Sequence, residues 1–260
     1  MYTEDLLQAQ LEARQAGRDF AVATIAEALG STPRTNGKMI VYADGTTLGT
    51  VGGGAAELQV TKDAVAQIKR GCNVLHHYNV GAETADDGMQ CGGKLSVLIE
   101  VYRANPLLVV VGGGHVGRCL IRVAKQTGFD VLLFDDRPAE AVPESAALAD
   151  RFIRVTDFAQ DICAADVPAG AYFVICGHSH ADDGIALKAA LTKQAAYVGM
   201  LGSRRKMEAL FTMLREQGVT EAQLAAVHTP IGLDLGGETP AEIAVAIMAQ
   251  IIAIQHGKQK

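Results

Sequence analysis

The chain has 260 residues, 49% of them hydrophobic, and a formal net charge of −6. Its length and apolar content suit one large or two modest domains with a substantial core. The negative charge and the shortness of the longest basic tract, Arg204–Lys206, argue against nucleic-acid binding.

No segment approaches the roughly 18 uninterrupted apolar residues of a membrane span. The start, MYTEDLLQAQLEARQ, has acidic residues where a signal peptide carries basic ones. We therefore expect a cytoplasmic protein without membrane contact. Five cysteines without a CxxC pair predict free thiols rather than a zinc site or a disulfide framework.

Residues 1–104 are predicted to form a mixed α+β domain. Asp44 and Gly45 favour a tight hairpin turn. The helical spacing of the segment after the hairpin puts Leu58, Val65 and Ile68 on one side. The expected elements are a helix at 3–16, a strand at 20–29, two strands within 38–51, a helix at 55–71 and a strand at 94–102.

Pro106 interrupts the extended run and marks a domain boundary, so residues 105–260 form the second domain. Short apolar strands alternate with helices there, which predicts a Rossmann-like α/β fold: a parallel sheet with helices on both faces. Thr239, Pro240 and Glu242 form a capping box that starts the last helix. The expected strands are 107–111, 131–135, 152–155, 172–176, 196–199 and 225–228.

Gly112, Gly114 and Gly117 form a GxGxxG sequence between the first of these strands and a helix. Such glycines allow a tight turn, the approach of a phosphate and close helix packing. Asp135 and Asp136 follow at the end of the next strand, where a carboxylate accepts hydrogen bonds from a ribose. These features predict a nucleotide-like ligand, with a βα turn whose glycines serve packing alone as the alternative.

Binding is better supported than dehydrogenation, because the sequence offers no clear hydride-transfer apparatus. We predict no catalytic residue and no metal site. His178, His180, Asp182 and Asp183 lie in one loop and suit acid–base chemistry or substrate contact, with surface histidines as the alternative.

Two further clusters suggest anion binding. Arg34 and the glycines Gly52, Gly53 and Gly54, which precede the helix of Glu57, suit an anion cradle or a flexible turn with solvated charges. Ser203 precedes Arg204, Arg205 and Lys206, three cations in the first turn of a helix, where the helix dipole disfavours them. An anionic ligand resolves that conflict, and solvation of the charges is the alternative.

Cys91 precedes two glycines and Lys94. Its thiol suits sulfur acceptance or contact with a metal-bound ligand. The alternative is a small buried hydrophobic residue, the usual role of a free cysteine.

The order of these segments resembles the XdhC/CoxI family, the accessory factors of xanthine dehydrogenase and related molybdenum hydroxylases. The segments that carry the resemblance are GSTPRTNGKM, DGTTLGTVGGGAAE, CGG, VVVGGGHVGR, FDDRP, YVGMLGSRRK and PIGLDLGGETPAEIAVAI. Two departures are Ala55, where many relatives have cysteine, and Cys176-Gly177-His178, where the family has Arg-Gly-His.

The resemblance implies an N-terminal XdhC/CoxI domain, a C-terminal Rossmann domain and a homodimer. It implies binding of the molybdenum cofactor, as molybdopterin or its dinucleotide form, and its sulfuration with a cysteine desulfurase. Insertion into an apo molybdenum hydroxylase follows, so the implied role is that of a chaperone. The family's motif residues fall on Ser31, Pro33, Arg34, Gly52 to Gly54, Glu57, Cys91, Gly112, Gly114, His115, Gly117 and the run from Gly202 to Lys206.

Two other hypotheses stay open. One is an NAD(P)-dependent oxidoreductase that uses the 112–117 loop, with His178 or His180 as the acid. The other is a regulatory nucleotide-binding module that requires no cysteine.

Overall fold

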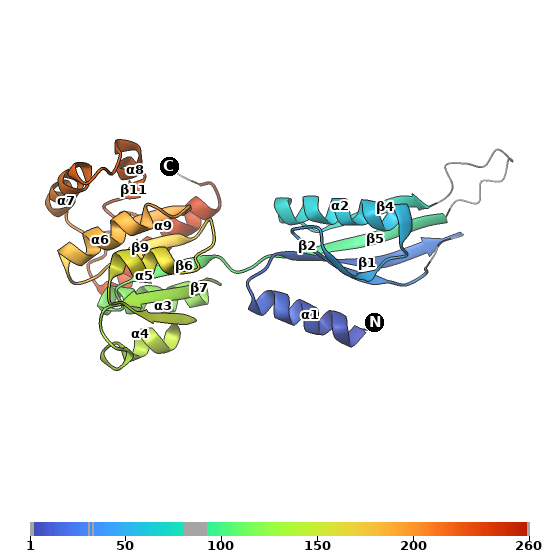
Figure 1. Cartoon of the computed structure of the whole chain (residues 1–260), viewed down its shortest axis with the longest axis horizontal. Coiled ribbons are helices and arrows are strands. Elements are labelled where there is room, and N and C mark those ends of the chain that lie inside the picture. Colours follow the sequence, from blue (N-terminus) through green and yellow to red (C-terminus); the bar gives the residue numbers. More distant parts are fainter. Residues whose placement is uncertain (1–2, 31, 33, 81–92, 259–260) are drawn as a thin grey trace. The chain divides into compact units, whose positions relative to one another are not determined.

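The computed structural model describes residues 3–30, 32, 34–80 and 93–258. Two compact units make up the chain, Met1–Ala104 and Asn105–Lys260 (Figure 1). Ser31, Pro33 and Cys91, three residues singled out in the sequence, lie outside the described residues.

The first unit is built on a five-stranded antiparallel sheet with the strand order β3-β2-β1-β5-β4. The predicted hairpin at Asp44 and Gly45 is confirmed, since β2 pairs with β3 and Gly45 adopts a φ of 84°. The elements are α1 (Thr3–Gln15), β1 (Phe20–Leu29), β2 (Lys38–Tyr42), β3 (Thr47–Thr50), α2 (Gly54–Arg70), β4 (Val74–Val80) and β5 (Gly93–Tyr102).

Helices α1 and α2 cover opposite faces of this sheet (Figure 1). Alternate residues of β1 point to the two faces, so Ala21 packs toward α2 and Phe20 toward α1. Leu58, which the spacing placed on one side of α2 with Val65 and Ile68, is 59% exposed and lies outside the buried face. Val60 and Ala64, four residues apart, face the sheet instead, and Leu58 lies outside that stripe.

The second unit is a six-stranded parallel sheet with the order β11-β10-β9-β6-β7-β8. Numbered from β6, this is the 3-2-1-4-5-6 order of the doubly wound dinucleotide-binding fold. The predicted α/β class is therefore confirmed. The strands are β6 (Leu107–Val111), β7 (Asp130–Asp135), β8 (Arg151–Arg154), β9 (Tyr172–Ile175), β10 (Tyr197–Met200) and β11 (Val227–His228).

Helices pack on both faces of the parallel sheet. Helices α3 and α9 contribute to one core cluster, and α5, α6 and α7 to the other. Successive residues of β6 point to opposite faces of the sheet. Val110 therefore belongs to the cluster of α3 and α9, and Val111 to that of α5, α6 and α7. The helices are α3 (His115–Gln126), the short 3₁₀ helix η1 (Ala139–Ala141), α4 (Pro143–Leu148), α5 (Phe158–Ala164), α6 (His180–Ala190), α7 (Arg204–Glu216), α8 (Glu221–Ala225) and α9 (Pro240–Gln255).

The last predicted strand, 225–228, is shorter in the structure. Thr220 and Gln223 form a capping box that starts α8, which extends to Ala225 and leaves two residues for β11. Throughout the described part of the chain, no helix is long and apolar enough to cross a bilayer.

Candidate functional site

The glycine loop, residues 112–117, follows β6. The strand order of the sheet reverses at this strand, because β7 lies on one side of β6 and β9 on the other. A Cβ on Gly112 would lie 2.7 Å from the Cα of Gly177, and one on Gly117 would lie 1.9 Å from the Gly112 carbonyl oxygen. Close packing therefore requires glycine at both positions. Gly114 differs: a Cβ there would have no atom within 4 Å, so its backbone faces open space.

Gly114 is also the N-cap of α3, and no side chain of the described residues caps this helix. The first turn, which begins with the exposed His115, therefore presents backbone N–H groups and the positive end of the helix dipole. This arrangement suits a phosphate or another anion.

The peptide of Gly113 is fixed from both sides. Its N–H donates to Asp135 Oδ2 at 2.7 Å, and its carbonyl accepts from the Ser145 hydroxyl at 2.7 Å. Asp135 is 1% exposed, and its two oxygens also accept from the Arg137 guanidinium, each at 2.8 Å. The loop is thus held in place before any ligand arrives.

This bonding changes the interpretation of Asp135, which the sequence suggested as a ribose acceptor. Burial by itself raises the pKa of Asp135, but hydrogen bonds from Arg137 and Gly113 outweigh it, so the pKa lies below its ordinary value. The ionised carboxylate is engaged within the protein. Asp136, next in the chain, is 41% exposed at its side chain and lines the pocket described below.

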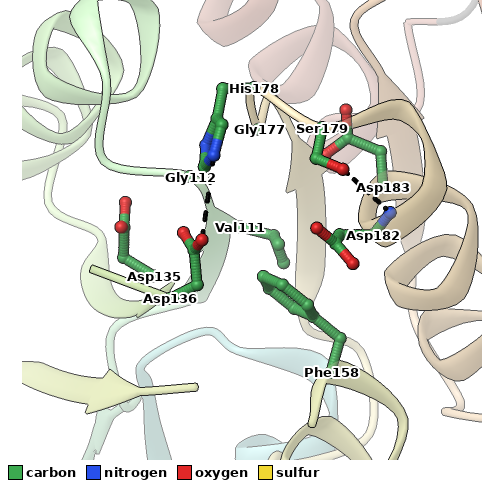
Figure 2. A pocket seen from close by; sticks show the side chains of 10 residues that line it. All are labelled: Val111, Gly112, Asp135, Asp136, Phe158, Gly177, His178, Ser179, Asp182 and Asp183. Carbon is green, nitrogen blue, oxygen red and sulfur yellow. Dashed lines mark hydrogen bonds and ion pairs between the residues drawn. The ribbon is translucent and has the colours of Figure 1, made fainter. Parts of the chain in front are cut away.

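A small pocket, with a free volume of about 10 Å³, lies at the carboxyl ends of β6, β7 and β9, where ligands bind in open α/β sheets. Asp136 and His178, whose Oδ2 and Nε2 atoms are 3.7 Å apart, border one side, and Ser179 and Asp182 the other (Figure 2). The full lining is Val111, Gly112, Asp135, Asp136, Phe158, Gly177, His178, Ser179, Asp182 and Asp183.

The polar lining of this pocket consists mainly of carboxylates. A ligand group that donates hydrogen bonds, such as a ribose hydroxyl or the amino group of a heterocycle, suits Asp136 and Asp182. The site therefore combines hydrogen-bond acceptors with the start of α3, whose geometry suits an anion. Together they suit a ligand that carries both a phosphate and a hydroxyl- or amino-bearing part.

The thiol of Cys176 lies beneath the loop and is buried. It donates to the Gly112 carbonyl at 3.3 Å, and burial raises its pKa to about 12. A neutral thiol in this position supports the loop and is no nucleophile at neutral pH.

The basic first turn of α7 also follows a strand of the parallel sheet, β10. Arg204, Arg205 and Lys206 are exposed, and none lines the pocket of Figure 2. Ser203 is the N-cap but makes no side-chain cap bond within the described part of the chain.

The triple-glycine loop of the first unit is already bonded to a carboxylate of the protein, that of Glu57. The Glu57 carboxylate accepts from the N–H groups of Val51 and Gly53, both at 3.0 Å, and from the Thr50 hydroxyl. Of the glycine N–H groups expected to cradle a ligand, that of Gly53 is thus occupied by Glu57, and that of Gly52 donates to the Thr50 hydroxyl at 3.1 Å. Arg34, on the connection before β2, is exposed.

Sequence reasoning missed three residues of the second-unit site. Arg137 and Ser145 fix the loop, and Phe158 lines the pocket at the start of α5. Arg137 lies in the FDDRP segment that carries the family resemblance, but nothing local indicated its contact with Asp135. Phe158 reaches the site through the fold alone. Among the residues that the structure places, no group of three or more His, Cys, Asp or Glu side chains is arranged to hold a metal ion.

Strand order and loop geometry define the class: a doubly wound Rossmann unit with a dinucleotide-type glycine loop, joined to an antiparallel α+β unit. The profile of the XdhC Rossmann domain matches residues 108–251, and that of the XdhC and CoxI family matches residues 13–79. The chain belongs to the XdhC/CoxI family.

Two relatives are similar to much of this chain. The Escherichia coli K12 protein YqeB is 34% identical over 238 residues, which are 91% of this chain and 44% of that protein. A Bacillus subtilis protein, described as a probable subunit of xanthine dehydrogenase, is 28% identical over 159 residues, which are 60% of this chain and 45% of that protein. The chain thus spans less than half the length of these relatives.

One solved structure shares the fold across the whole chain. It is a crystal structure described as a xanthine dehydrogenase from Bacillus halodurans, with a TM-score of 0.54 and 20% identity over 100% of this chain and 97% of that one. At this identity the similarity shows the fold.

Proposed function

We propose that this chain binds the molybdenum cofactor, as molybdopterin or its dinucleotide form, and serves as an accessory factor in the maturation of a xanthine dehydrogenase-type hydroxylase. Family membership supports the proposal, as does the description of the Bacillus subtilis relative as a probable subunit of xanthine dehydrogenase. The proposed partners are the apo-hydroxylase, a cysteine desulfurase and a second copy of this chain.

The observation that carries the proposal is the open N-cap of α3 at Gly114. The space that a Cβ would occupy there is empty, and the first-turn N–H groups point to an anion site at the carboxyl edge of the sheet. The terminal phosphate of a pyranopterin suits this position. The start of α3 therefore fits the phosphate of this group.

Each side chain of the site has a role of its own in this proposal. The helix start holds the phosphate, and Asp136 and Asp182 accept hydrogen bonds from the ligand's hydroxyl or amino donors. When bound, the cofactor supplies the molybdenum centre that the hydroxylase uses. Cys91 is the proposed sulfur-contacting thiol and lies outside the described residues.

The test is to purify the full chain from a host that makes the cofactor, oxidise the denatured protein and measure fluorescent pterin. We expect pterin near one per chain. Gly114→Ala should lower the affinity of the chain for the pterin about tenfold. The added methyl group moves the phosphate away from the helix start, which costs one or two hydrogen bonds. The mutant should fold, since Gly114 has an ordinary φ of −70° and no neighbour within reach of the added Cβ.

Asp136→Ala should also lower pterin content, whereas Asp166→Ala, which removes an exposed carboxylate of the same unit outside the pocket, should not. An NAD titration of the pterin-free protein runs in parallel. Saturable NAD binding without any pterin would replace the proposal with a nicotinamide-dependent enzyme or a regulatory nucleotide module. Fully sulfurated hydroxylase in cells that lack the chain would contradict the accessory role.

A further inference from the structure

A second concave site lies between α6 and α7, at the carboxyl end of β10. It encloses about 350 Å³, within the range of small-molecule pockets. Its principal lining is Ala181 of α6, Met200 of β10, and Lys206, Met207, Ala209, Leu210 and Met213 of α7. None of these residues lines the pocket at the glycine loop.

Beside this groove, a glycine of α6 lies close to Leu210, one of the lining residues. A Cβ on Gly184 of α6 would lie 2.7 Å from Leu210 Cδ1, so glycine lets α7 approach α6 at that point. Met207 is buried deep in the unit, whereas Met213 is 39% exposed at the surface. Methionine side chains adapt to the shape of an apolar ligand, which makes the groove suited to variable apolar bodies.

The chemistry of the lining narrows the class of ligand. Its side chains are apolar apart from Lys206, so the groove offers few partners to a heterocycle rich in hydrogen-bond donors. Burial of such donors without partners is costly. A hydrocarbon or simple aromatic body fits this lining, and a pterin does not.

Three basic residues lie in or next to the lining of the groove and favour a ligand with an anionic head group. Lys206 lines the groove, and Arg204 and Arg205 precede it in the first turn of α7, which contains no acidic residue. Within the described part of the chain, no ion pair engages these three cations. They are exposed, in a chain whose net charge is −6. An anionic head beside Lys206 would neutralise this concentration of positive charge.

We propose that the α6–α7 groove binds a small amphipathic anion: an apolar body among Met207, Leu210 and Met213, with a single carboxylate or phosphate beside Lys206. A single cavity of this volume accommodates one compact body, whereas a docked helix presents apolar anchors over several turns. The inference is independent of the proposed function, because it concerns a different cavity and a different ligand class.

The test is calorimetric titration of the full chain with four straight-chain probes of ten carbons each: decanoate, decyl phosphate, decanol and decylammonium. We expect the anions to bind at least about fivefold more tightly than decanol, and decylammonium more weakly than decanol, as one to three nearby cations would require. The ratio of decanoate to decyl phosphate affinity identifies the preferred head group. Raising the salt concentration should reduce the anion preference.

Ala209→Trp, at an exposed position whose side chain lines the groove, should reduce decanoate affinity more than tenfold by filling the cavity. Thr212→Trp places the same ring at an exposed position of α7 outside the lining and should leave affinity unchanged. Lys206→Gln should weaken decanoate about threefold and leave decanol unaffected.

Equal affinity for decanoate and decylammonium would overturn the proposal, as would decanoate binding that Ala209→Trp leaves intact. Absence of probe binding would overturn it as well. If Ala209→Trp then abolished a concentration-dependent dimer, the groove would be a contact between two copies of the chain.

Discussion

Asp135 and Asp136 are neighbours in the chain, yet they serve different purposes. Asp135 is buried and bonded to Arg137 and to the Gly113 N–H, so it belongs to the framework of the loop. Asp136 is partly exposed and contacts His178 at the pocket. A residue type at a given spacing thus indicates where a carboxylate stands, and the side-chain partners decide what it does.

We predict that Asp135→Ala lowers the free energy of unfolding by about 3 kcal/mol, because it leaves Arg137 and the buried Gly113 N–H without their shared acceptor. Asp136→Ala should change it by less than about 0.5 kcal/mol, as is usual for an exposed side chain. Urea denaturation of both variants measures these differences. Equal effects of the two substitutions would contradict the assignment.

Glu57 holds the triple-glycine loop of the first unit, and its bonding has a pH signature. Burial raises the pKa of Glu57. Hydrogen bonds from the Thr50 hydroxyl and from the N–H groups of Gly53, Val51 and Gly52 lower it by more, so the net pKa lies below the ordinary value. A carboxyl with a depressed pKa stabilises the fold fully above its unfolded-state pKa. That contribution is lost as the pH falls through the folded-state pKa.

We therefore predict that the loop remains intact down to about pH 4.3, the ordinary pKa of glutamate, and loosens only below it. The amide proton shifts of Val51 and Gly53, followed by NMR between about pH 7 and pH 2, report this change. Glu57→Gln should remove the titration. A midpoint at or above the ordinary glutamate pKa would show that the carboxylate is not held as described.

At the scale of elements, α9 shows how local signals and packing reinforce each other. Thr239 accepts from the Glu242 N–H, and the Glu242 carboxylate accepts from the Thr239 N–H at 2.9 Å, which closes the capping box. The same helix buries Ala244, Ile247 and Ile251 against the sheet. Capping sets where the helix begins, and that start sets which residues reach the core.

Thr239→Ala should lower the free energy of unfolding by about 1 kcal/mol through loss of this cap. Thr220→Ala at α8, a five-residue helix, removes a similar cap from an element with one buried residue, and we expect a smaller loss. Chemical denaturation of the two variants makes the comparison. A larger loss of unfolding free energy at Thr220 would show that the packing of α9 in the core does not increase the effect of losing its cap.

On the scale of the whole molecule, each of the two units contains its own hydrophobic core. Sheet residues packed against α1 and α2 form the cores of Met1–Ala104. The two faces of the parallel sheet form those of Asn105–Lys260. A unit with its own core unfolds as a cooperative entity.

We predict two transitions in differential scanning calorimetry. Asp135→Ala should shift one of them by several degrees, as about 3 kcal/mol implies for a unit of this size, and leave the other in place. A matched substitution in the first unit, Val97→Ala, should shift the other transition, because Val97 is fully buried in its core. A single transition that moves as a whole in both variants would contradict independent unfolding.

Much of the fold followed from local sequence. Apolar runs predicted β6, β7 and β9 to within one residue of their ends, because a strand buried on both faces needs a nearly continuous apolar segment. The GxGxxG spacing predicted the turn before α3, because Gly112 and Gly117 leave no room for a Cβ. β4 was not predicted, since VLHHYNV alternates too weakly to distinguish a strand from a loop.

By itself, the sequence determined where most strands and helices lie, that the second unit is a doubly wound sheet, and which family the chain belongs to. These features depend on residues close together in the chain, whose propensities and spacing act locally. Only the tertiary structure decided that Asp135 points inward, that Phe158 lines the pocket and that α6 and α7 enclose an apolar groove. These depend on contacts between residues distant in sequence, such as Gly184 with Leu210, which no local pattern encodes.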